Sequence, residues 1–301
     1  MSVSFIIRQL ALPAAALCLL AAAQPAQALL DFFKKADKKV PTADERRVQE
    51  AAAGELLAQA RAEQSKGNSG RASDLYLSIL KNYPFSQAAA EAAYARALIL
   101  RESGKLQNAF EAFQVLIKDY RSSPRFSDAI AQQFEIAEEA KGGKKQRSKI
   151  LVPMKMRSDD LIQLYRTIII NAPFGKYAPM AQFSIAEVYE DQGERDMAIA
   201  AYQGVVDNYP SSPQAAEAQF RIGSISSMAA RRSEDKSNLT TTRDALTTYV
   251  AANPDGTRTG EAEQLISQVN EAQAAQSLQV GKFYEKQGKP KAAAIYYNEA
   301  M

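Results

Sequence analysis

The chain has 301 residues, of which 24% are charged and 46% are hydrophobic, and its formal net charge is only +3. This balance is typical of a folded protein and gives no support for nucleic-acid binding, which depends on a strongly basic surface. The chain has no histidine and one cysteine, Cys18, so it lacks the usual ligands of zinc, haem and copper and cannot form a Ser-His or Cys-His nucleophile pair; we predict no enzyme, catalytic residue, metal site or cofactor.

The N-terminal residues are typical of an export signal. Arg8 is followed by an apolar stretch over residues 10–23, and Ala26-Gln27-Ala28 forms a cleavage site of the small-x-small type. The stretch of about fourteen residues is shorter than the roughly 20 that span a bilayer, so cleavage is favoured over an uncleaved anchor. We therefore predict a signal peptide over residues 1–28, cleaved after Ala28, and a mature protein that begins at Leu29.

Two further N-terminal features bear on membrane attachment. Lipidation of Cys18 would need a small residue just before it, and Leu17 stands there, so lipidation is the less favoured alternative. Residues 29–42 are predicted to form a flexible tether. The alternative is a short apolar anchor with a basic flank, which would touch a membrane or a partner. Its residues would be Leu29, Leu30, Phe32, Phe33, Lys34, Lys35, Lys38 and Lys39.

A pattern of four positions recurs along the rest of the chain. A small residue, a Gly, an Ala and an aromatic residue follow one another at gaps of seven, five and four residues, in four copies: Ala60/Gly67/Ala72/Tyr76, Ala97/Gly104/Ala109/Phe113, Ala186/Gly193/Ala198/Tyr202 and Gly281/Gly288/Ala293/Tyr297. The Gly suits a chain reversal in the left-handed region, and the small residues suit the crossing of two antiparallel helices. The aromatic residue lies one turn after the Ala on the same helix face. The pattern predicts pairs of helices joined by short turns.

Proline residues and a second aromatic position extend this pattern. Because Pro cannot continue a helix interior, second helices are predicted to end at X-Pro pairs: Tyr83-Pro84 and Tyr209-Pro210, and more weakly Ala172-Pro173 and Asn253-Pro254. An aromatic residue follows ten residues after a Pro in four places: Tyr94, Phe134, Phe183 and Phe220. We predict an all-α fold over residues 43–301, a tetratricopeptide-like α-solenoid of five to six helical hairpins.

The first helix is expected to begin at a capping box formed by Thr42 and Glu45 and to run to about Lys66. The hairpins are then predicted over roughly these residues: 43–82; 87–120; from 126, with one helix ending near 140 and the next starting near 158; 177–208; from 213, with a polar loop over 233–242 between its helices; and 259–286 with 290–300.

The segment 141–157 is predicted to be an insertion in the third hairpin. It contains seven basic residues and no acidic one: Lys141, Lys144, Lys145, Arg147, Lys149, Lys155 and Arg157. We expect a solvated loop. The alternative is a site that docks an acidic partner or anionic lipid headgroups, where each basic residue contributes about 1 kcal/mol.

Tyrosines at the repeat positions are expected to pack between helices. A solenoid of this kind also exposes its first helices, and we predict that Tyr94, Arg96 and Arg101 line a groove for an extended peptide through aromatic and charge-assisted contacts. One group of carboxylates is predicted to lie on a solvated outward face: Glu135, Glu138 and Glu139.

Several segments of the C-terminal half resemble the BamD family of outer-membrane assembly lipoproteins. They are Ala218-Gln219-Phe220-Arg221-Ile222-Gly223, Thr240-Thr241-Thr242-Arg243-Asp244-Ala245-Leu246, Asn253-Pro254 and Val280-Gly281-Lys282-Phe283-Tyr284-Glu285-Lys286-Gln287-Gly288. The resemblance implies a periplasmic scaffold of five hairpins at the inner face of the outer membrane, within the machinery that folds β-barrel proteins. It implies that the hairpins around Tyr94 receive unfolded barrel substrates, and that the C-terminal hairpins hold the central barrel component. The candidate partner interface consists of Arg221, Arg243, Lys282, Phe283 and Tyr284.

We therefore expect a non-catalytic periplasmic scaffold, peripherally associated with the outer membrane, which binds barrel-assembly components and unfolded barrel substrates. Two alternatives with the same fold remain. One is a cell-envelope coordinator that binds peptidoglycan enzymes or a lipoprotein during division, and the other is a pilot protein for a secretion pore.

Overall fold

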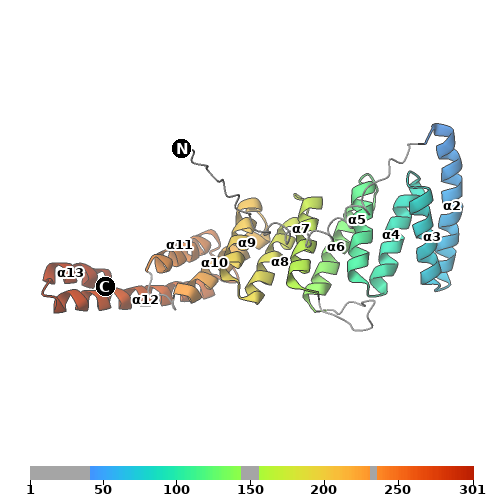
Figure 1. The fold of residues 1–301 in the computed structure, drawn as a ribbon. Coiled ribbons are helices and arrows are strands. Elements are labelled where there is room, and N and C mark those ends of the chain that lie inside the picture. The colour runs from blue at the N-terminus through green and yellow to red at the C-terminus, as the bar shows by residue number, and fades with distance from the viewer. Residues whose placement is uncertain (1–40, 144–155, 231–235) are drawn as a thin grey trace, which may run out of the picture. The chain divides into compact units, whose positions relative to one another are not determined.

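The computed structural model describes residues 41–143, 156–230 and 236–301, and every element within these ranges is an α-helix (Figure 1). The chain divides into two compact units, Met1–Val48 and Gln49–Met301. The predicted signal peptide and the predicted tether up to residue 40 lie outside the described residues. In the part of the chain that is described, no helix combines the length and apolar character needed to cross a bilayer.

In the first unit, the described residues contain the start of helix α2 (Ala43–Ser65) and its predicted capping box. The Thr42 amide donates to Oε2 of Glu45 at 2.7 Å, and the Glu45 amide donates to Oγ1 of Thr42 at 3.4 Å. The bond from the Thr42 backbone is the main reason why the pKa of Glu45 is lowered. These reciprocal bonds satisfy two free amides and confirm the predicted helix start.

In the second unit, the described helices follow one another as hairpins. After α2 come α3 (Ser69–Asn82), α4 (Gln87–Glu102), α5 (Leu106–Asp119), α6 (Phe126–Lys141), α7 (Ser158–Asn171), α8 (Tyr177–Gln192), α9 (Arg195–Asn208), α10 (Pro213–Ala230), α11 (Lys236–Ala252), α12 (Thr259–Lys286) and α13 (Pro290–Glu299). From α3 onward each helix packs against the next one in the chain. The first helix of one hairpin also contacts the first helix of the following hairpin, in the pairs α6 with α8, α8 with α10, and α10 with α12. This is the predicted all-α, tetratricopeptide-like arrangement of helical hairpins.

The four repeat glycines form the turns inside the hairpins, as predicted. Their φ angles are +80° at Gly67, +73° at Gly104, +75° at Gly193 and +69° at Gly288. The amide after each glycine reaches back over the last helical turn, for example from Asn68 to the Glu63 carbonyl at 2.9 Å. This is the hydrogen bond of a Schellman helix end, which requires a left-handed residue at the glycine position.

The small residues of the motif lie where the two helices of a hairpin cross. The first three copies use alanines that are fully buried: Ala60, Ala72, Ala97, Ala109, Ala186 and Ala198. In the last copy, a Cβ on Gly281 would lie only 2.6 Å from ring atoms of Tyr297. The helices there approach too closely for any larger residue, which explains the glycine.

The second aromatic position packs against the first. Within a hairpin, one ring from each helix forms a pair with centroids 5.1–6.3 Å apart: Tyr94 with Phe113, Phe134 with Tyr165, Phe183 with Tyr202, and Phe220 with Tyr249. These rings fill the hairpin interiors, as expected for repeat aromatics. Tyr165 and Tyr249 take this role in the two hairpins where the four-position motif is not readable.

Two predicted boundaries are wrong. The polar loop expected over 233–242 ends early, because α11 already begins at Lys236. Its Ser and Thr residues are typical of a loop, but Leu239, Thr242 and Leu246 are buried at helical spacing and give the helix an inward face. At the predicted insertion, Lys141 belongs to α6, while residues 144–155 lie outside the described part of the chain.

Candidate protein-interaction site

Tyr94 of the predicted peptide groove is covered on two sides. The edge of its ring meets the Phe113 ring at a centroid distance of 5.6 Å, and the Arg125 guanidinium lies 5.1 Å from the ring centroid. Burial is the main reason why the pKa of Tyr94 is raised. Its ring therefore packs α4 against α5 and the start of α6, and only part of it is accessible to a ligand.

Arg101 lies along the same helix face as Tyr94, but its guanidinium is already bound. It contacts Gln132 at 2.5 Å and Glu135 at 2.7 Å, and it forms an ion pair with Glu139. Arg101 therefore joins α4 to α6. Glu135 and Glu139 were predicted to face solvent. Glu135 is exposed as predicted, although it pairs with Arg101, whereas the prediction is wrong for Glu139, which is largely covered in its ion pair with Arg101.

Arg96 lies on a different face of α4 from Tyr94 and Arg101. It is half-buried, and its Nε has no hydrogen-bond partner among the described residues. The charged group that acts on its pKa is Asp74 of α3. Burial lowers the pKa of Arg96 against the opposing effect of Asp74. The structure thus does not bring the three predicted groove residues together at one place.

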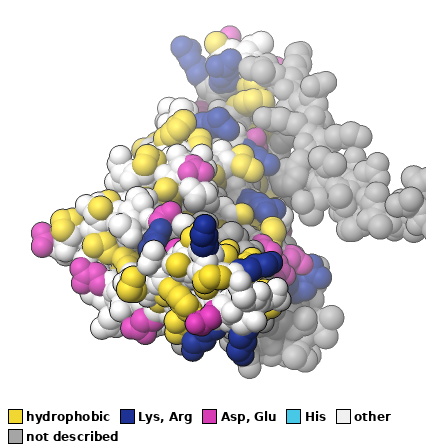
Figure 2. All heavy atoms as spheres, turned by 90° about the vertical axis from the view of Figure 1, so that its left-hand side faces the viewer, with side chains coloured by type: hydrophobic (Ala, Val, Ile, Leu, Met, Phe, Trp, Pro, Cys, Tyr) yellow, Lys and Arg dark blue, Asp and Glu magenta, His cyan; other side chains and the backbone are white. Residues whose placement is uncertain are grey.

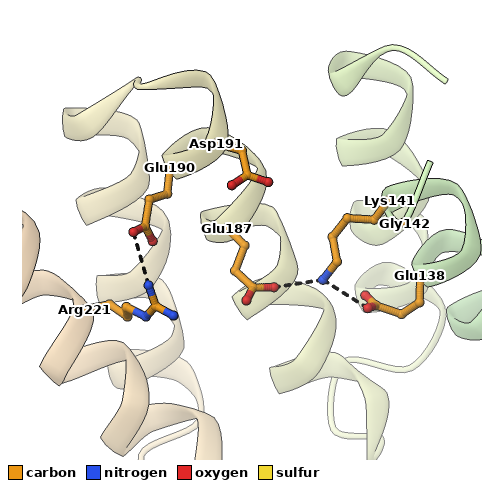
Figure 3. Close-up of a pocket in the computed structure, with 7 residues that line it drawn as sticks. All are labelled: Glu138, Lys141, Gly142, Glu187, Glu190, Asp191 and Arg221. Carbon is orange, nitrogen blue, oxygen red and sulfur yellow. Dashed lines mark hydrogen bonds and ion pairs between the residues drawn. The ribbon is translucent and has the colours of Figure 1, made fainter. Parts of the chain in front are cut away.

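A charged pocket lies between the first helices of three successive hairpins (Figure 3). Its volume is about 340 Å³, and its lining comes from α6 with its C-terminal turn, α8 and α10: Glu138, Lys141, Gly142, Glu187, Glu190, Asp191 and Arg221. Figure 3 shows the side chains from the three helices pointing toward one another.

Lys141 joins α6 to α8 inside this pocket. Its Nζ lies 3.0 Å from the Glu138 carboxylate and 2.8 Å from the Glu187 carboxylate. Burial alone would lower the pKa of Lys141, but hydrogen bonds to Glu187 and Glu138 outweigh burial and raise it. The ammonium group therefore stays charged at neutral pH.

Two carboxylates of the pocket also accept hydrogen bonds from core tyrosines. Glu138 accepts from the Tyr165 hydroxyl at 2.6 Å, and Glu190 accepts from the Tyr202 hydroxyl at 2.7 Å. Burial and then these bonds raise the pKa of both tyrosines, so the hydroxyls stay protonated and donate. The solvated face predicted for Glu138 is thus also wrong.

Arg221, predicted for the partner interface, belongs to this pocket. Its Nη1 lies 3.2 Å from Glu190 of α8, and its Nε lies 3.2 Å from Glu217 of α10. The pocket as a whole presents four carboxylates against two cations. Its electrostatic potential therefore favours a cationic group of a bound polypeptide.

The other predicted interface residues lie further along the chain. Arg243 of α11 contacts Asp244 at 3.2 Å and Gln273 of α12 at 3.4 Å, so it holds α11 against α12. Lys282 and Phe283 are exposed on α12, and Phe283 keeps 56% of its surface accessible.

The last hairpin, α12 with α13, exposes an apolar surface. We call it the C-terminal surface and define it by Leu278, Lys282, Phe283, Tyr284 and Ile295. Tyr284 stacks on Tyr296 with ring centroids 5.5 Å apart and an interplanar angle of 9°. Leu278 and Ile295 are 42% and 61% exposed. Figure 2 shows this end of the molecule, where hydrophobic side chains lie in the open between Lys and Arg side chains.

The pocket contacts could have been partly foreseen from one repeat position. The residue three before each turn glycine is polar in all four motif copies: Gln64, Arg101, Glu190 and Glu285. In the three copies whose motif aromatic residue is Tyr, this polar residue accepts a hydrogen bond from the tyrosine hydroxyl at 2.6–2.7 Å. In the copy with Phe113, the polar residue is Arg101, which contacts α6 instead. Among the described residues, no group of three or more Asp, Glu, His or Cys side chains is placed to hold a metal ion.

This geometry defines a tetratricopeptide-type protein built from stacked helical hairpins, a class of fold that generally serves as a protein-interaction scaffold. The comparisons with known families agree. Residues 57–124 match a tetratricopeptide repeat family, and residues 164–301 match the YfiO family, described as an outer membrane lipoprotein family. No curated protein matches the sequence.

Solved structures with similar chains include two titled as tetratricopeptide repeat proteins and MamA. One from Parabacteroides merdae has 13% identity and a TM-score of 0.35, with 83% of this chain and 92% of that chain covered. MamA from Desulfovibrio magneticus has 14% identity and a TM-score of 0.34, with coverages of 68% and 97%. YrrB, a tetratricopeptide repeat protein titled as having an unusual peptide-binding site, has 15% identity and a TM-score of 0.35, with coverages of 69% and 90%.

Proposed function

We propose that this protein is a non-catalytic periplasmic scaffold of the BamD type, which holds protein partners during the assembly of outer-membrane β-barrel proteins. The observation that carries the proposal is that residues 164–301, which match the outer membrane lipoprotein family, also contain the C-terminal surface. Export by the predicted signal peptide and association with the inner face of the outer membrane belong to the same proposal.

The C-terminal surface has the properties of a protein-binding site. Exposed aromatic and aliphatic side chains in one hairpin supply the kind of anchors that dominate most protein interfaces. Its carboxylates are engaged within the hairpin: Glu285 accepts from Tyr297 at 2.6 Å, and Glu299 accepts from Ser277 at 3.4 Å. The surrounding lysines are exposed: Lys282, Lys286, Lys289 and Lys291. This charge distribution fits a partner with an acidic rim around an apolar centre.

In this proposal, the N-terminal hairpins receive unfolded substrate segments. Of the predicted groove residues, Arg101 is occupied by α6 and Tyr94 is partly covered, whereas Arg96 forms no ion pair among the described residues. The charged pocket between α6, α8 and α10 adds an acidic position for basic residues of such a segment.

Photo-crosslinking in cells tests the proposal at the C-terminal surface. A photoreactive phenylalanine analogue at position 283 should capture a barrel-assembly component, and the same analogue at exposed Met197 of α9 serves as the matched control. Phe283→Ala should lower recovery of that component about tenfold, the loss expected for an interface anchor. Solubilised outer membranes that release no barrel-assembly component with the protein would contradict the proposal. Recovery of peptidoglycan enzymes instead would support the division coordinator.

A further inference from the structure

Among the described residues, one phenylalanine is almost fully in solvent. Phe174, in the turn between α7 and α8, is 99% exposed, and Ile170 in the last turn of α7 is 77% exposed. Among the large hydrophobic residues of the described ranges, only Met301 at the chain end has an exposure close to that of Phe174. A single exposed apolar side chain is ordinary on a protein surface, but two large ones four residues apart at the end of one helix form a small apolar patch, and such patches mark contact sites.

Comparison with the other turns between hairpins shows that the fold does not require this ring. Five such turns close with the same hydrogen bond, from the amide of the fourth residue to the carbonyl of the first, at 2.9–3.1 Å. The third residue of the turn is, in chain order, Phe85, Ser122, Phe174, Ser211 and Asp255. Three of the five are polar and exposed, so a polar residue is fully compatible with the turn.

The charged residues nearest to Phe174 along the chain are basic. Arg166 lies one helical turn before Ile170 on the same face of α7, and Lys176 follows the turn. Arg166 donates to the Tyr189 hydroxyl at 3.4 Å and forms no ion pair among the described residues, and the Lys176 ammonium lies 5.5 Å from the Tyr177 ring centroid. Between Asp160 and Glu187 the chain contains no acidic residue.

We infer that the α7–α8 turn is a membrane-contact site, at which Phe174 and Ile170 enter the boundary between headgroups and acyl chains of an anionic phospholipid leaflet. Apolar side chains at a protruding tip with basic residues beside them are suited to this boundary. Lys176 and Arg166 are placed to meet anionic headgroups. A protein partner that accepted Phe174 and Ile170 in a groove would not require the neighbouring sequence to lack acidic residues, whereas contact with an anionic leaflet does. The inference rests on the proposed location at a membrane and adds a second, lipid-binding contact to the scaffold.

The chain contains no tryptophan, which allows a site-specific test. Phe174→Trp places the only indole at the tip, so its fluorescence reports on that position even if another segment binds the vesicles. With vesicles that contain phosphatidylglycerol, the emission of the exported protein should shift to the blue and become protected from a soluble quencher. Vesicles of phosphatidylcholine alone should produce a smaller shift, because they lack the anionic headgroups. Ser211→Trp, at the same position of the α9–α10 turn, is the matched control and should show no shift.

A second variant measures the contribution to binding. Phe174→Ser introduces the residue found in two equivalent turns, so folding should be preserved, and co-sedimentation with phosphatidylglycerol vesicles should fall about tenfold or more. Unchanged emission of the Phe174→Trp protein with these vesicles overturns the inference, and so does an equal shift of the Ser211→Trp protein. A shift produced by solubilised outer-membrane proteins but not by lipid would assign the tip to a protein partner, and the lipid inference would then be wrong. The vesicles contain no assembly component, so failure here leaves the crosslinking result at Phe283 unaffected.

Discussion

The close packing of α10 on α11 predicts that a Gly→Ala substitution lowers the free energy of unfolding at Gly223, whereas the same substitution raises it at Gly54. Gly223 is buried in α10, and a Cβ at this position would lie 2.7 Å from Cγ of Leu246 in α11. Leu246 is fully buried and packs in one cluster with Phe220, Tyr249 and Ala262, so it has no free space into which to move.

Two terms determine the effect of Gly223→Ala. Replacing Gly by Ala inside a helix gains about 1 kcal/mol from helix propensity. Forcing a methyl group into a filled core costs about 1–3 kcal/mol, and the short contact with an immobile side chain places this site in the upper part of that range. We therefore expect the free energy of unfolding to fall by about 1–2 kcal/mol.

Gly54→Ala is the matched control, because Gly54 lies inside α2 and a Cβ there would meet nothing within 4 Å. It should raise the free energy of unfolding by about 0.5–1 kcal/mol. Urea unfolding followed by far-ultraviolet circular dichroism measures both variants. Leu246→Ala should also cost less in the Gly223→Ala background than in the parent protein, because the added methyl fills part of the cavity. If both glycine variants are stabilised equally, the reasoning from the α10–α11 contact is refuted.

Three further predictions concern polar contacts. Gln133 is fully buried and binds the Phe110 carbonyl and two amide side chains, so Gln133→Ala should lower the free energy of unfolding by about 2 kcal/mol in urea, and an unchanged midpoint would contradict this. Burial raises the pKa of Tyr120 to about 12, whereas an unfolded tyrosine ionises near 10, so this contribution to stability is complete below about pH 10 and declines between pH 10 and 12. Tyr120→Phe should therefore make the urea midpoint fall less steeply with pH over that range. If the midpoints of the parent and the variant fall equally steeply, the reasoning that burial of Tyr120 contributes this pH dependence is wrong. Arg101→Met should cost about 1–2 kcal/mol, between the values for exposed and buried ion pairs, and should weaken the salt dependence of the midpoint; an unaltered salt dependence would show that the Arg101 pairs contribute nothing.

The hairpin architecture could be predicted because its determinants are local. Each turn glycine and each X-Pro pair acts on the backbone of its own few residues, so the spacing of these residues located most helix ends closely. The early start of α11 could not be inferred in the same way. Its Ser and Thr residues favour a loop locally, and burial of Leu239 and Leu246 against neighbouring helices outweighs that preference.

The candidate sites were less predictable, because they depend on which helix faces meet. Tyr94 and Arg96 are two residues apart in sequence, yet they point to different neighbours, since adjacent hairpins cover different faces of α4. The carboxylates at Glu135 and Glu139 looked like a solvated stripe because their partner, Arg101, is supplied by the preceding hairpin. Phe174 did not stand out in the sequence, because an aromatic residue after Pro fits the general repeat composition.

The two kinds of junction in this protein differ in their tolerance of extra chain. Turns within hairpins vary from the two-residue turn between α8 and α9 to the long segment between α6 and α7, whereas the five junctions between hairpins keep one hydrogen-bonded four-residue turn. Reporter peptides or affinity tags for tracking the protein in living cells therefore belong beside Gly67 or Gly193. Cutting or lengthening the chain at Pro84 or Pro210 would instead disturb the register between neighbouring modules.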